Sequence, residues 1–516
     1  MDILLVNPPT LSRGKGVQGI DPDLPSMPYY RLLTVESGRP EGFSTMPGEH
    51  LGLQSLQASL ESSGHRVDVL NACVGLHATL RQTLNTAQRE RYDVIGFTGP
   101  LDVFGENLWM ARALRDAGYT GHITLGHDFA TLNHELVLRL YPEFDSVVRG
   151  EGEETVKELA RALQTGGDLA QVPGLSFRRG NGIVCNKPRP PLEDLDILPW
   201  VTRYDAHRVT GLGMSLGVFT KRGCPYLCTF CTTGAVPIGE GYAPRARWRQ
   251  RSATSVVDEI EMLVQDFGAK SVTIVDDLYL SKGAAGCAHA LEVAEELLRR
   301  DLRIQYMIDC RVDSIERDVF KVLKKSGLKK VFVGVESASE AALSNFRKGY
   351  RPDSIRERLR TLDELGVEYV LGYIFFSPFE TLDGLEQNLR FVSDLGRGDY
   401  TLFLQSVRVY PGTPLQRQLA ESGLLIGEFP FYKAAYLDPS VKQIRDLMLG
   451  FESLSLPHLE ASSTRGASRA SAARDFVYQL AKTLLLELLE CGRRGDLSDM
   501  DKVFEQVVGR LGDALE

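Results

Sequence analysis

Three cysteines on one short segment constrain this chain more than any other feature of its sequence. They are Cys224, Cys228 and Cys231, spaced C-x3-C-x2-C after an apolar stretch, Met214 to Phe219, that is typical of a β-strand. Three thiolates on one tight loop are close enough to ligate a single iron–sulfur cluster. A 4Fe–4S cluster normally takes four thiolates, so this loop would leave one iron open to another ligand.

Two other interpretations of the motif are a structural zinc knuckle and three unrelated thiols. Zinc usually takes a fourth Cys or His at a short, regular offset. Neither residue type occurs between Cys231 and Cys287, so the sequence favours the cluster. The remaining cysteines are expected to be small buried apolar residues (Cys73, Cys185, Cys287, Cys310 and Cys491).

The cysteine loop resembles the cluster-binding loop of the radical S-adenosylmethionine (SAM) superfamily. In that family the amino and carboxylate groups of SAM chelate the open iron. Phe230, the aromatic residue before the last cysteine, also fits the family pattern. The resemblance implies a 4Fe–4S cluster and SAM as cofactors, and Phe230 as a residue beside SAM.

Strands and helices alternate after the cysteine loop, as they do in a parallel α/β fold. Helix 255–267 carries its apolar residues on one face. Six strands are expected, at residues 215–219, 271–275, 304–308, 331–335, 369–375 and 404–409. Six such units match the partial (β/α)6 TIM barrel of radical SAM enzymes, in which reactive groups lie at the carboxyl ends of the strands.

The same resemblance assigns SAM contacts at these strand ends. Glu336 and Ser337 match the fourth-strand motif that meets the ribose or methionyl part of SAM, and Arg347 matches the cationic segment after it. Arg311 matches the arginine of an A-R-V-D pattern, and Asp276 opens the sequence D-D-L-Y where the family has D-D-x-F. The alternative for any charged residue at a strand end is that it caps the next helix. No catalytic acid or base is assigned.

The N-terminal third also alternates strands with helices. Strands are expected at residues 3–6, 67–70, 93–97 and 122–126, with a helix at 106–117 before the last of them. This order is typical of a doubly wound, Rossmann-like parallel sheet, which binds ligands at the carboxyl ends of its strands. No G-x-G-x-x-G sequence follows the first strand, which argues against a dinucleotide.

The loops at these strand ends resemble those of the cobalamin-binding domain that precedes the radical SAM core in one large subclass. The resemblance implies cobalamin as a third cofactor. It also implies which residues contact cobalamin, each at the end of an expected strand. They are Asn7 and Pro8, Thr98 and Leu101 in the loop that touches the cobalamin tail, Gly126 and His127 at a Gly-Gly pair, and Arg149, Gly150 and Glu151 in an R-G-E-G-E signature.

Two departures from this subclass matter. The D-x-H-x-x-G motif that supplies an axial imidazole to cobalt in other cobalamin proteins is absent. A histidine from that loop is therefore not expected below the cobalt. His127 replaces the second glycine of the Gly-Gly pair, and we expect it to be a loop residue near the site rather than a cobalt ligand. The alternative is a Rossmann-like domain without a cofactor.

Composition shifts suggest where the domains divide. Residues 169–204 are rich in proline and glycine and are expected to form a linker with a small hairpin that turns at residues 180–182. The expected domains are a Rossmann-like cobalamin-binding domain at 1–168, a radical SAM partial TIM barrel at 205–414 and a helical C-terminal domain at 415–516.

Charge and hydropathy limit the partners. The chain has 516 residues and a net charge of −9, without a basic tract that would indicate nucleic-acid binding. No apolar run reaches the ~18 residues needed to span a bilayer. The N-terminus begins with a strand rather than a signal peptide, and eight cysteines at this length do not form a disulfide scaffold. We therefore expect a cytoplasmic protein, and the oligomeric state stays open.

The resemblance covers residues 1–415 and implies a cobalamin-dependent radical SAM enzyme. The implied reaction is methylation of an unactivated carbon of a small-molecule or natural-product substrate, through a 5′-deoxyadenosyl radical and methylcobalamin. The implied partner is an electron donor such as flavodoxin or ferredoxin. The first alternative keeps these cofactors but rearranges, contracts or cyclises the substrate. Methylthiolation needs three further N-terminal cysteines, whereas only Cys73 and Cys185 precede Cys224. A non-catalytic cobalamin or SAM sensor is the remaining hypothesis.

Overall fold

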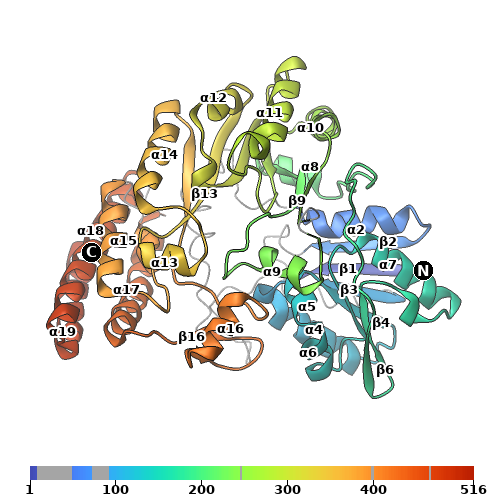
Figure 1. Ribbon diagram of the computed structural model, residues 1–516, viewed down its shortest axis with the longest axis horizontal. Coiled ribbons are helices and arrows are strands. Elements are labelled where there is room, and N and C mark those ends of the chain that lie inside the picture. Colours follow the sequence, from blue (N-terminus) through green and yellow to red (C-terminus); the bar gives the residue numbers. More distant parts are fainter. Residues whose placement is uncertain (9–48, 72–91, 244–246, 397–399, 464–466, 516) are drawn as a thin grey trace.

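The structure is a computed structural model that describes residues 1–8, 49–71, 92–243, 247–396, 400–463 and 467–515 (Figure 1). An α/β domain at the right of Figure 1 contains the N-terminus, a second sheet with its helices lies in the middle, and long C-terminal helices lie at the left. Cys73 falls outside the described residues.

The first domain is built on a sheet of order β2-β1-β3-β4-β5-β6-β7. Its strands are β1 (Asp2–Asn7), β2 (Arg66–Asn71), β3 (Val94–Thr98), β4 (His122–Gly126), β5 (Ser146–Val148), β6 (Leu175–Arg179) and β7 (Gly182–Cys185). The first five strands are parallel. Helices connect them: α2 (Leu51–Glu61), α4 (Phe104–Asp116), α5 (Asp128–Leu132), α6 (His134–Leu140) and α7 (Glu153–Thr165).

Helices cover both faces of this sheet, because alternate residues of each strand point to opposite sides. In β1, Leu4 and Val6 pack into a core with α4, α5 and α6. Ile3 and Leu5 pack into a separate core with α2 and α7. The expected doubly wound, Rossmann-like domain is therefore confirmed.

The hairpin expected in the linker forms, but it belongs to the first sheet. β6 pairs antiparallel with β5, with Phe177 opposite Ser146, and β7 pairs with β6. The two strands therefore lengthen the sheet at one edge. The division of the chain near residue 204 stays a prediction.

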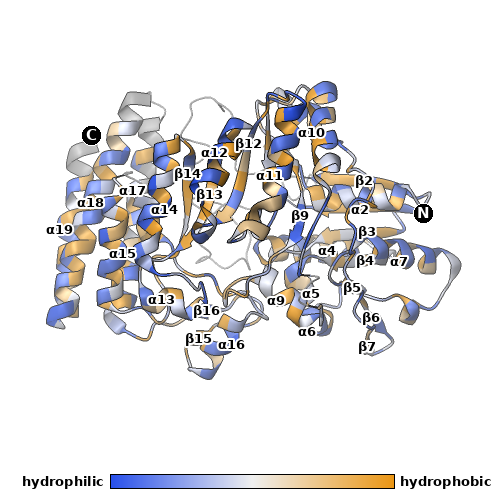
Figure 2. Cartoon of the chain, turned by 45° about the horizontal axis from the view of Figure 1, so that its top comes forward, coloured by the Kyte–Doolittle hydropathy of each residue, from blue (hydrophilic) through white to orange (hydrophobic). Residues whose placement is uncertain are grey.

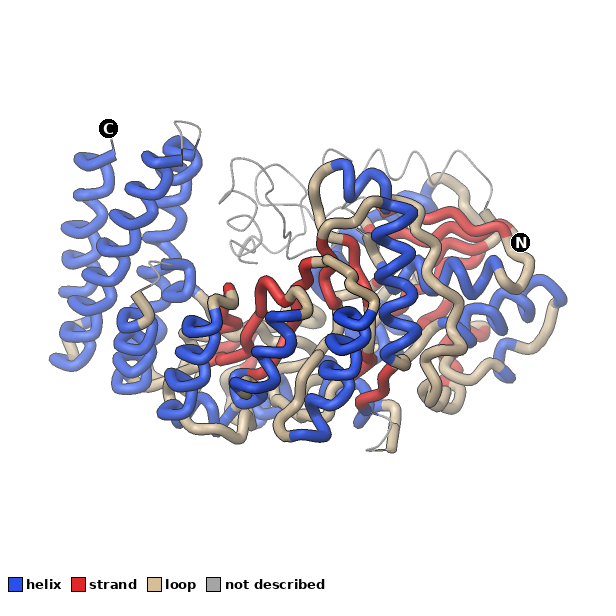
Figure 3. Tube along the Cα trace, turned by 90° about the horizontal axis from the view of Figure 1, so that it is seen from above, coloured by secondary structure: helices blue, strands red, loops and turns tan. Residues whose placement is uncertain are grey.

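The second sheet has the order β14-β13-β12-β11-β8, and all its strands are parallel. The strands are β8 (Leu216–Val218), β11 (Ser271–Ile274), β12 (Gln305–Arg311), β13 (Leu328–Glu336) and β14 (Glu368–Tyr373). Helices lie along the outside of this sheet (Figure 3), namely α10 (Ala253–Phe267), α11 (Ala284–Arg299), α12 (Arg317–Lys325), α14 (Pro352–Leu365) and α15 (Leu382–Asp394). Hydrophobic residues line the strands and the inner sides of these helices (Figure 2).

The sixth expected strand, 404–409, is not a strand. The chain forms the 3-10 helix η5 (Tyr400–Leu404) and then meets the sheet through an isolated bridge between Phe376 and Ser406. The carbonyl of Gln405 accepts hydrogen bonds from the backbone N–H groups of Phe375 and Phe376. The segment therefore keeps the sixth position beside β14, and the α/β barrel architecture is confirmed without a sixth strand.

Three large rings pack together where the sixth segment meets the sheet. Phe375 packs edge to face on Phe376 and Phe403, with ring centroids 5.1 and 5.7 Å apart. All three rings are fully buried. Aromatic packing thus adds to the few backbone hydrogen bonds that hold this segment.

Helices make up the C-terminal part, as expected. α16 (Pro414–Glu421) and the short hairpin of β15 (Leu425–Ile426) and β16 (Lys433–Ala434) lead to α17 (Pro439–Ser463), α18 (Ala467–Arg494) and α19 (Leu497–Leu515). α18 packs on α15 and η5, and Val477, Leu484 and Leu488 enter the core of the second sheet. Within the described ranges, no helix is both long enough and apolar enough to cross a membrane.

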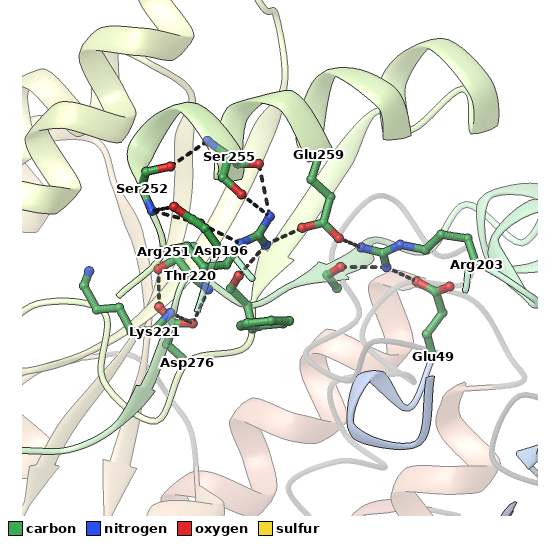
Figure 4. Close-up of polar contacts among 12 residues, drawn as sticks. Glu49, Asp196, Arg203, Thr220, Lys221, Arg251, Ser252, Ser255, Glu259 and Asp276 are labelled. Carbon is green, nitrogen blue, oxygen red and sulfur yellow. Dashed lines mark hydrogen bonds and ion pairs between the residues drawn. The ribbon is translucent and has the colours of Figure 1, made fainter. Parts of the chain in front are cut away.

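A buried chain of alternating charges links the first domain to the second sheet (Figure 4). Arg203 donates to Glu49 at 2.8 Å and to Glu259 at 2.5 Å. Arg251 donates to the other carboxylate oxygen of Glu259. None of these side chains is more than 4% exposed. Arg203 also donates to the carbonyl of Gly217 in β8, at 2.9 Å.

Removing one member of this chain leaves buried charge without a partner, which costs about 3–5 kcal/mol. Arg203→Met keeps the bulk of the side chain but strips Glu49 and Glu259 of their shared cation. We expect the free energy of unfolding, measured in urea, to fall by that amount. Lys442→Met is the matched control, because Lys442 pairs with Asp446 on an exposed helix face and should lose less than about 1 kcal/mol. Equal losses in the two variants would contradict the assignment.

Candidate active site

The predicted cluster ligands lie on the loop between β9 (Lys221–Gly223) and α9 (Thr232–Gly239). All three are free thiols and are partly accessible. Burial raises the pKa of Cys224 to about 12, and the neighbouring charges of Cys231 and Cys228 act in the same direction. Thiols this poorly solvated favour a bound cation, because a metal offsets the cost of forming the thiolates. The donor set fits a cluster held by three protein ligands.

Gly223 fixes the turn into this loop. β9 pairs antiparallel with β10 (Trp248–Gln250), with Gly223 opposite Trp248. The residue has a φ of +80°, and a Cβ atom there would lie 2.2 Å from the carbonyl oxygen of Arg247. Only glycine fits this position, so Cys224 starts from a defined backbone direction.

Asp276, a predicted SAM contact, supports the strand that leads into the loop (Figure 4). Its carboxylate accepts hydrogen bonds from the backbone N–H groups of Thr220, at 2.6 Å, and Lys221, at 2.9 Å, and from the Thr220 hydroxyl. Burial raises the pKa of Asp276 to about 6. The neighbouring Asp277, the second aspartate of the D-D-L-Y sequence, is exposed. It accepts a hydrogen bond from Thr233, at 3.0 Å, next to the cluster loop.

Arg311, a predicted SAM contact at the end of β12, lies against the cysteine loop. Its Nη1 is 3.8 Å from the Sγ of Cys228. Its guanidinium stacks over the ring of Tyr226, 3.8 Å from the centroid, and donates to Asp313 at 2.9 Å. The arginine thus brings a positive charge next to one cluster ligand. The cation–π contact with Tyr226 holds the guanidinium in place.

Glu336 and Lys348 form an ion pair at the end of β13, with the Nζ 2.9 Å from Oε1. Glu336 has a φ of +65°, a left-handed conformation that costs energy for a residue with a Cβ atom. Arg347, the predicted SAM contact, also has a positive φ and is exposed. The turn therefore directs Lys348, rather than Arg347, to the strand end. A local sequence pattern does not distinguish adjacent cations.

Ser337 and Phe230, also predicted beside SAM, are turned into the protein. Ser337 is fully buried, and its hydroxyl donates to the Asn388 carbonyl oxygen on α15 at 2.9 Å. Phe230 packs edge to face on Phe346, with centroids 5.1 Å apart. Ser337 follows the end of β13 and Phe230 lies on the cysteine loop, and each side chain takes part in packing or hydrogen bonding within the protein.

The predicted cobalamin contacts of the first three strands lie together at one edge of the first sheet. Thr98 at the end of β3 is in register with Gly126 at the end of β4. Asn7 and Pro8 end β1, which pairs with β3. Leu101 is buried and begins the 3-10 helix η1 (Leu101–Val103). The carboxyl ends of three neighbouring strands therefore form one continuous edge, where such sheets bind ligands.

His127 follows this edge in a strained conformation. Its φ is +85° and its ψ is 170°, a region that is essentially reserved for glycine. The ring is 41% exposed and contacts Asp128. Although burial opposes both shifts, the pairing raises the pKa of His127 and lowers that of Asp128 to about 2. Asp128 also accepts a hydrogen bond from Thr232, the residue after the last cluster cysteine. The edge of the first sheet thus touches the cluster loop.

The R-G-E-G-E segment pairs across the domain junction. Arg149 lies 3.4 Å from Glu240, and both side chains are buried. Glu151 accepts from Arg249 of β10 at 2.5 Å. Gly150, between them, has a φ of +67°. The side chains of Arg149 and Glu151 are therefore occupied by partners from the second domain, so a cobalamin contact here would come from the backbone.

Glu153, the last residue of the same signature, holds the cluster loop from the other domain. Arg222 donates to both of its carboxylate oxygens, at 2.5 and 3.2 Å. Ser55 donates to one of them at 2.8 Å. Arg222 is two positions before Cys224, so this two-pronged contact fixes the loop as well as the domains. The sequence shows both charges, but nothing in a local pattern pairs them.

The glycine-like conformation of His127 predicts unusual mutational behaviour. His127→Gly and His127→Ala both remove the imidazole and its contact with Asp128, but only the glycine relieves the backbone. We expect the free energy of unfolding of the glycine variant to be about 1–3 kcal/mol higher than that of the alanine variant. Thermal unfolding of the two variants tests this, and equal stabilities would show that the backbone is not strained.

The contact between Glu153 and Arg222 predicts a local effect on the cluster. Glu153→Gln keeps the shape of the side chain but leaves the Arg222 guanidinium with no charged partner at 2.5 Å. We expect release of iron to a chelator to accelerate by about tenfold or more, since breaking a buried ion pair costs more than the 1.4 kcal/mol that a tenfold change needs. Glu154→Gln, on the same helix and paired with Lys157, is the control. Unchanged iron release in Glu153→Gln would disprove this role.

Two family models match the chain. The B12 binding domain matches residues 44–160, which include the strand ends from Thr98 to Glu151. The Radical SAM superfamily matches residues 218–392, which include the three cluster cysteines. The first match covers the domain on one side of the junction described above, and the second match covers the domain on the other side.

Curated relatives share both halves. The chain is 28% identical to an uncharacterised methyltransferase, PH0819, of Pyrococcus horikoshii, over 86% of this chain and 88% of that protein. It is 28% identical to the anaerobic magnesium-protoporphyrin IX monomethyl ester cyclase of a Synechocystis species, over 64% of this chain and 66% of that protein.

A solved structure has the same fold. The cobalamin-dependent S-adenosylmethionine radical enzyme OxsB with aqua-cobalamin bound superposes with a TM-score of 0.68 at 17% identity. The superposition covers 100% of this chain and 84% of that one. It supports the order of the domains: Rossmann-like sheet, partial barrel and C-terminal helices.

The two matched domains imply a 4Fe–4S cluster, SAM and cobalamin as the cofactors. The three free thiols beside Arg311 suit the cluster. The shared edge of β1, β3 and β4 is the ligand-binding edge of the first sheet. This chain therefore contains a B12-binding domain followed by a Radical SAM domain, the domain combination of cobalamin-dependent radical SAM enzymes.

Proposed function

We propose that this protein is a cobalamin-dependent radical SAM enzyme that methylates an unactivated carbon of a small-molecule substrate. The observation that carries the proposal is the meeting of two cofactor-binding edges. Asp128, beside the edge of the first sheet, accepts a hydrogen bond from Thr232, which follows Cys231. A methyl group on one cofactor and a radical from the other can both reach a substrate held between them.

The similarity to the Pyrococcus horikoshii protein supports methyl transfer, because it covers most of both chains. When bound, the cluster with SAM supplies a 5′-deoxyadenosyl radical, and cobalamin supplies the methyl group. The protein has to hold these reactive groups in a defined geometry and keep water away from them.

Within this proposal, the residues at the second sheet divide into two roles. Arg311 and the pair of Glu336 and Lys348 present charge at the strand ends, where SAM carries an amino and a carboxylate group. Asp276 and Ser337 act from below, through hydrogen bonds that fix the cluster loop and the end of β13. Arg347 and Phe230 stay predicted SAM contacts.

On the first sheet, the proposed cobalamin contacts are the edge residues at the ends of β1, β3 and β4, together with His127. His127 and Asp277 lie close enough for their charges to influence each other across the domain junction. Both are accessible to solvent. We propose that the substrate lies between these two side chains, and that a flavodoxin or ferredoxin supplies the electron that reduces the cluster.

A second candidate is cyclisation without methyl transfer, with the same cofactors. The relative that favours it is the anaerobic magnesium-protoporphyrin IX monomethyl ester cyclase of Synechocystis, which matches 64% of this chain. Product mass separates the two reactions. Methylation adds one CH2 unit to the substrate, whereas an oxidative cyclisation removes hydrogen.

Cofactor content is the first test. Anaerobic reconstitution with iron, sulfide and hydroxocobalamin, followed by desalting, is expected to leave about four irons and one cobalt for each chain. The variant Cys224→Ala/Cys228→Ala/Cys231→Ala should lose the iron and keep the cobalt. With SAM and a reductant, the wild-type chain should then form 5′-deoxyadenosine, and the variant should not. Iron without cobalt would overturn the methylation proposal and leave a radical SAM enzyme.

A further inference from the structure

Three metal-binding side chains meet at the outer edge of the first domain, away from the cluster loop. Cys185 ends β7, and His134 and Glu135 begin α6. Their ligand atoms all lie within 4.8 Å of one another, and no other group of three such residues in the described part of the chain meets that limit. A thiolate, an imidazole and a carboxylate are the donors that Zn²⁺ takes from proteins.

Cys185 differs from the other cysteines outside the cluster motif. We expected all of these to be buried, and Cys287, Cys310 and Cys491 are. Cys185 is exposed, so that expectation is wrong for this residue. Successive side chains of a strand point to opposite faces of the sheet. The start of α6 lies beside the face that carries Cys185.

The distances around the thiol match those expected around a shared ion. The Sγ of Cys185 is 3.6 Å from the Nδ1 of His134 and 3.7 Å from the Oε1 of Glu135. In a tetrahedral Zn²⁺ site with Zn–S bonds of about 2.3 Å and Zn–N or Zn–O bonds of about 2.0–2.1 Å, the sulfur lies roughly 3.5 Å from the other two ligand atoms. The two separations seen here are close to this value.

The ligands are carried by a rigid frame. α6 packs against both strands of the hairpin, and β6 is bonded to the edge of the sheet. Ser176 of β6 is fully buried, and its hydroxyl lies 3.0 Å from the Nδ1 of His134. This contact places Nδ1 on the side of the ring that faces the hairpin, where Cys185 stands. Because Nδ1 has one lone pair, a metal ion bound there would replace the hydrogen bond from Ser176.

Nearby cations do not compete strongly for Glu135. Arg139 approaches it at 3.9 Å, but both side chains are more than half exposed, and such pairs contribute little. Arg149 also acts on His134 electrostatically. Its charge is already balanced by Glu240, 3.4 Å away.

We propose that Cys185, His134 and Glu135 bind one Zn²⁺ ion, with water at the open position. The ion would clamp the hairpin onto α6. The next residue, Asn186, accepts a hydrogen bond from Arg149 through its carbonyl, and Arg149 pairs with Glu240 of the second domain. The zinc site thus secures the first residue of the R-G-E-G-E segment. This proposal is independent of the reaction that the enzyme catalyses.

Zinc binding by the reconstituted holoenzyme tests the proposal. In the holoenzyme the cluster occupies the three cysteines of the loop, so those thiols cannot take up the added zinc. The protein is titrated anaerobically with Zn²⁺ against a chromophoric chelator, with a phosphine as the reductant. We expect one tightly bound Zn²⁺ for each chain and a higher thermal midpoint when it is present. Cys185→Ser and His134→Ala should each weaken binding at least tenfold and lose the thermal shift.

Arg139→Gln is the matched control. It changes the same face of α6 and removes a charge beside Glu135, so it should keep the zinc. Retained iron and cobalt in Cys185→Ser would show that this variant is folded. If the wild-type holoenzyme binds no more zinc than Cys185→Ser, or if Arg139→Gln loses zinc as the ligand variants do, the proposal is wrong.

Discussion

Buried ion pairs between the two domains are the interaction on which the site depends. The first domain has its own apolar cores on either face of its sheet, and the second sheet has another. The junction has some apolar contacts, such as Phe129 with Phe429, but it is also bridged by buried ion pairs such as Arg222 with Glu153 and Arg203 with Glu49. Apolar surfaces tolerate sliding, whereas a buried charge with its partner displaced is costly. These pairs therefore favour one relative orientation of the domains, and two cofactors from different domains need one orientation to act on the same carbon.

The ion pairs also account for the position of the cysteine loop. Arg222 reaches into the first domain just before Cys224, Gly223 sets the backbone between them, and Asp276 holds the strand from the other side. The loop is thus restrained from both domains. A cluster with only three protein ligands has to be held by its surroundings as well as by its thiolates, since the fourth position is given to SAM.

The sequence predicted what depends on local pattern. Cysteine spacing, alternating strands and helices, and the residues that follow each strand are all local, and the structure confirms the two sheets and their order. The sequence is less informative about which of two adjacent charged residues faces a site. Asp276 is buried and its neighbour Asp277 is exposed; likewise Lys348 is buried and Arg347, which has a positive φ, is exposed. The apolar pattern at 404–409 predicted a strand, but the segment begins in a 3-10 helix and meets the sheet only through an isolated bridge and a few backbone hydrogen bonds. Partners far apart in the chain, such as Arg203 and Glu49, leave no trace in a local pattern.

The link between Glu153 and Arg222 also bears on how the enzyme matures. A ribosome releases the first domain before the cysteine loop, and domains generally fold as units in that order. Glu153 is therefore in place on α7 when Arg222 emerges. The nascent loop can therefore dock on a folded domain as soon as Arg222 emerges, and contacts of the chain itself then fix the backbone that carries the three cysteines.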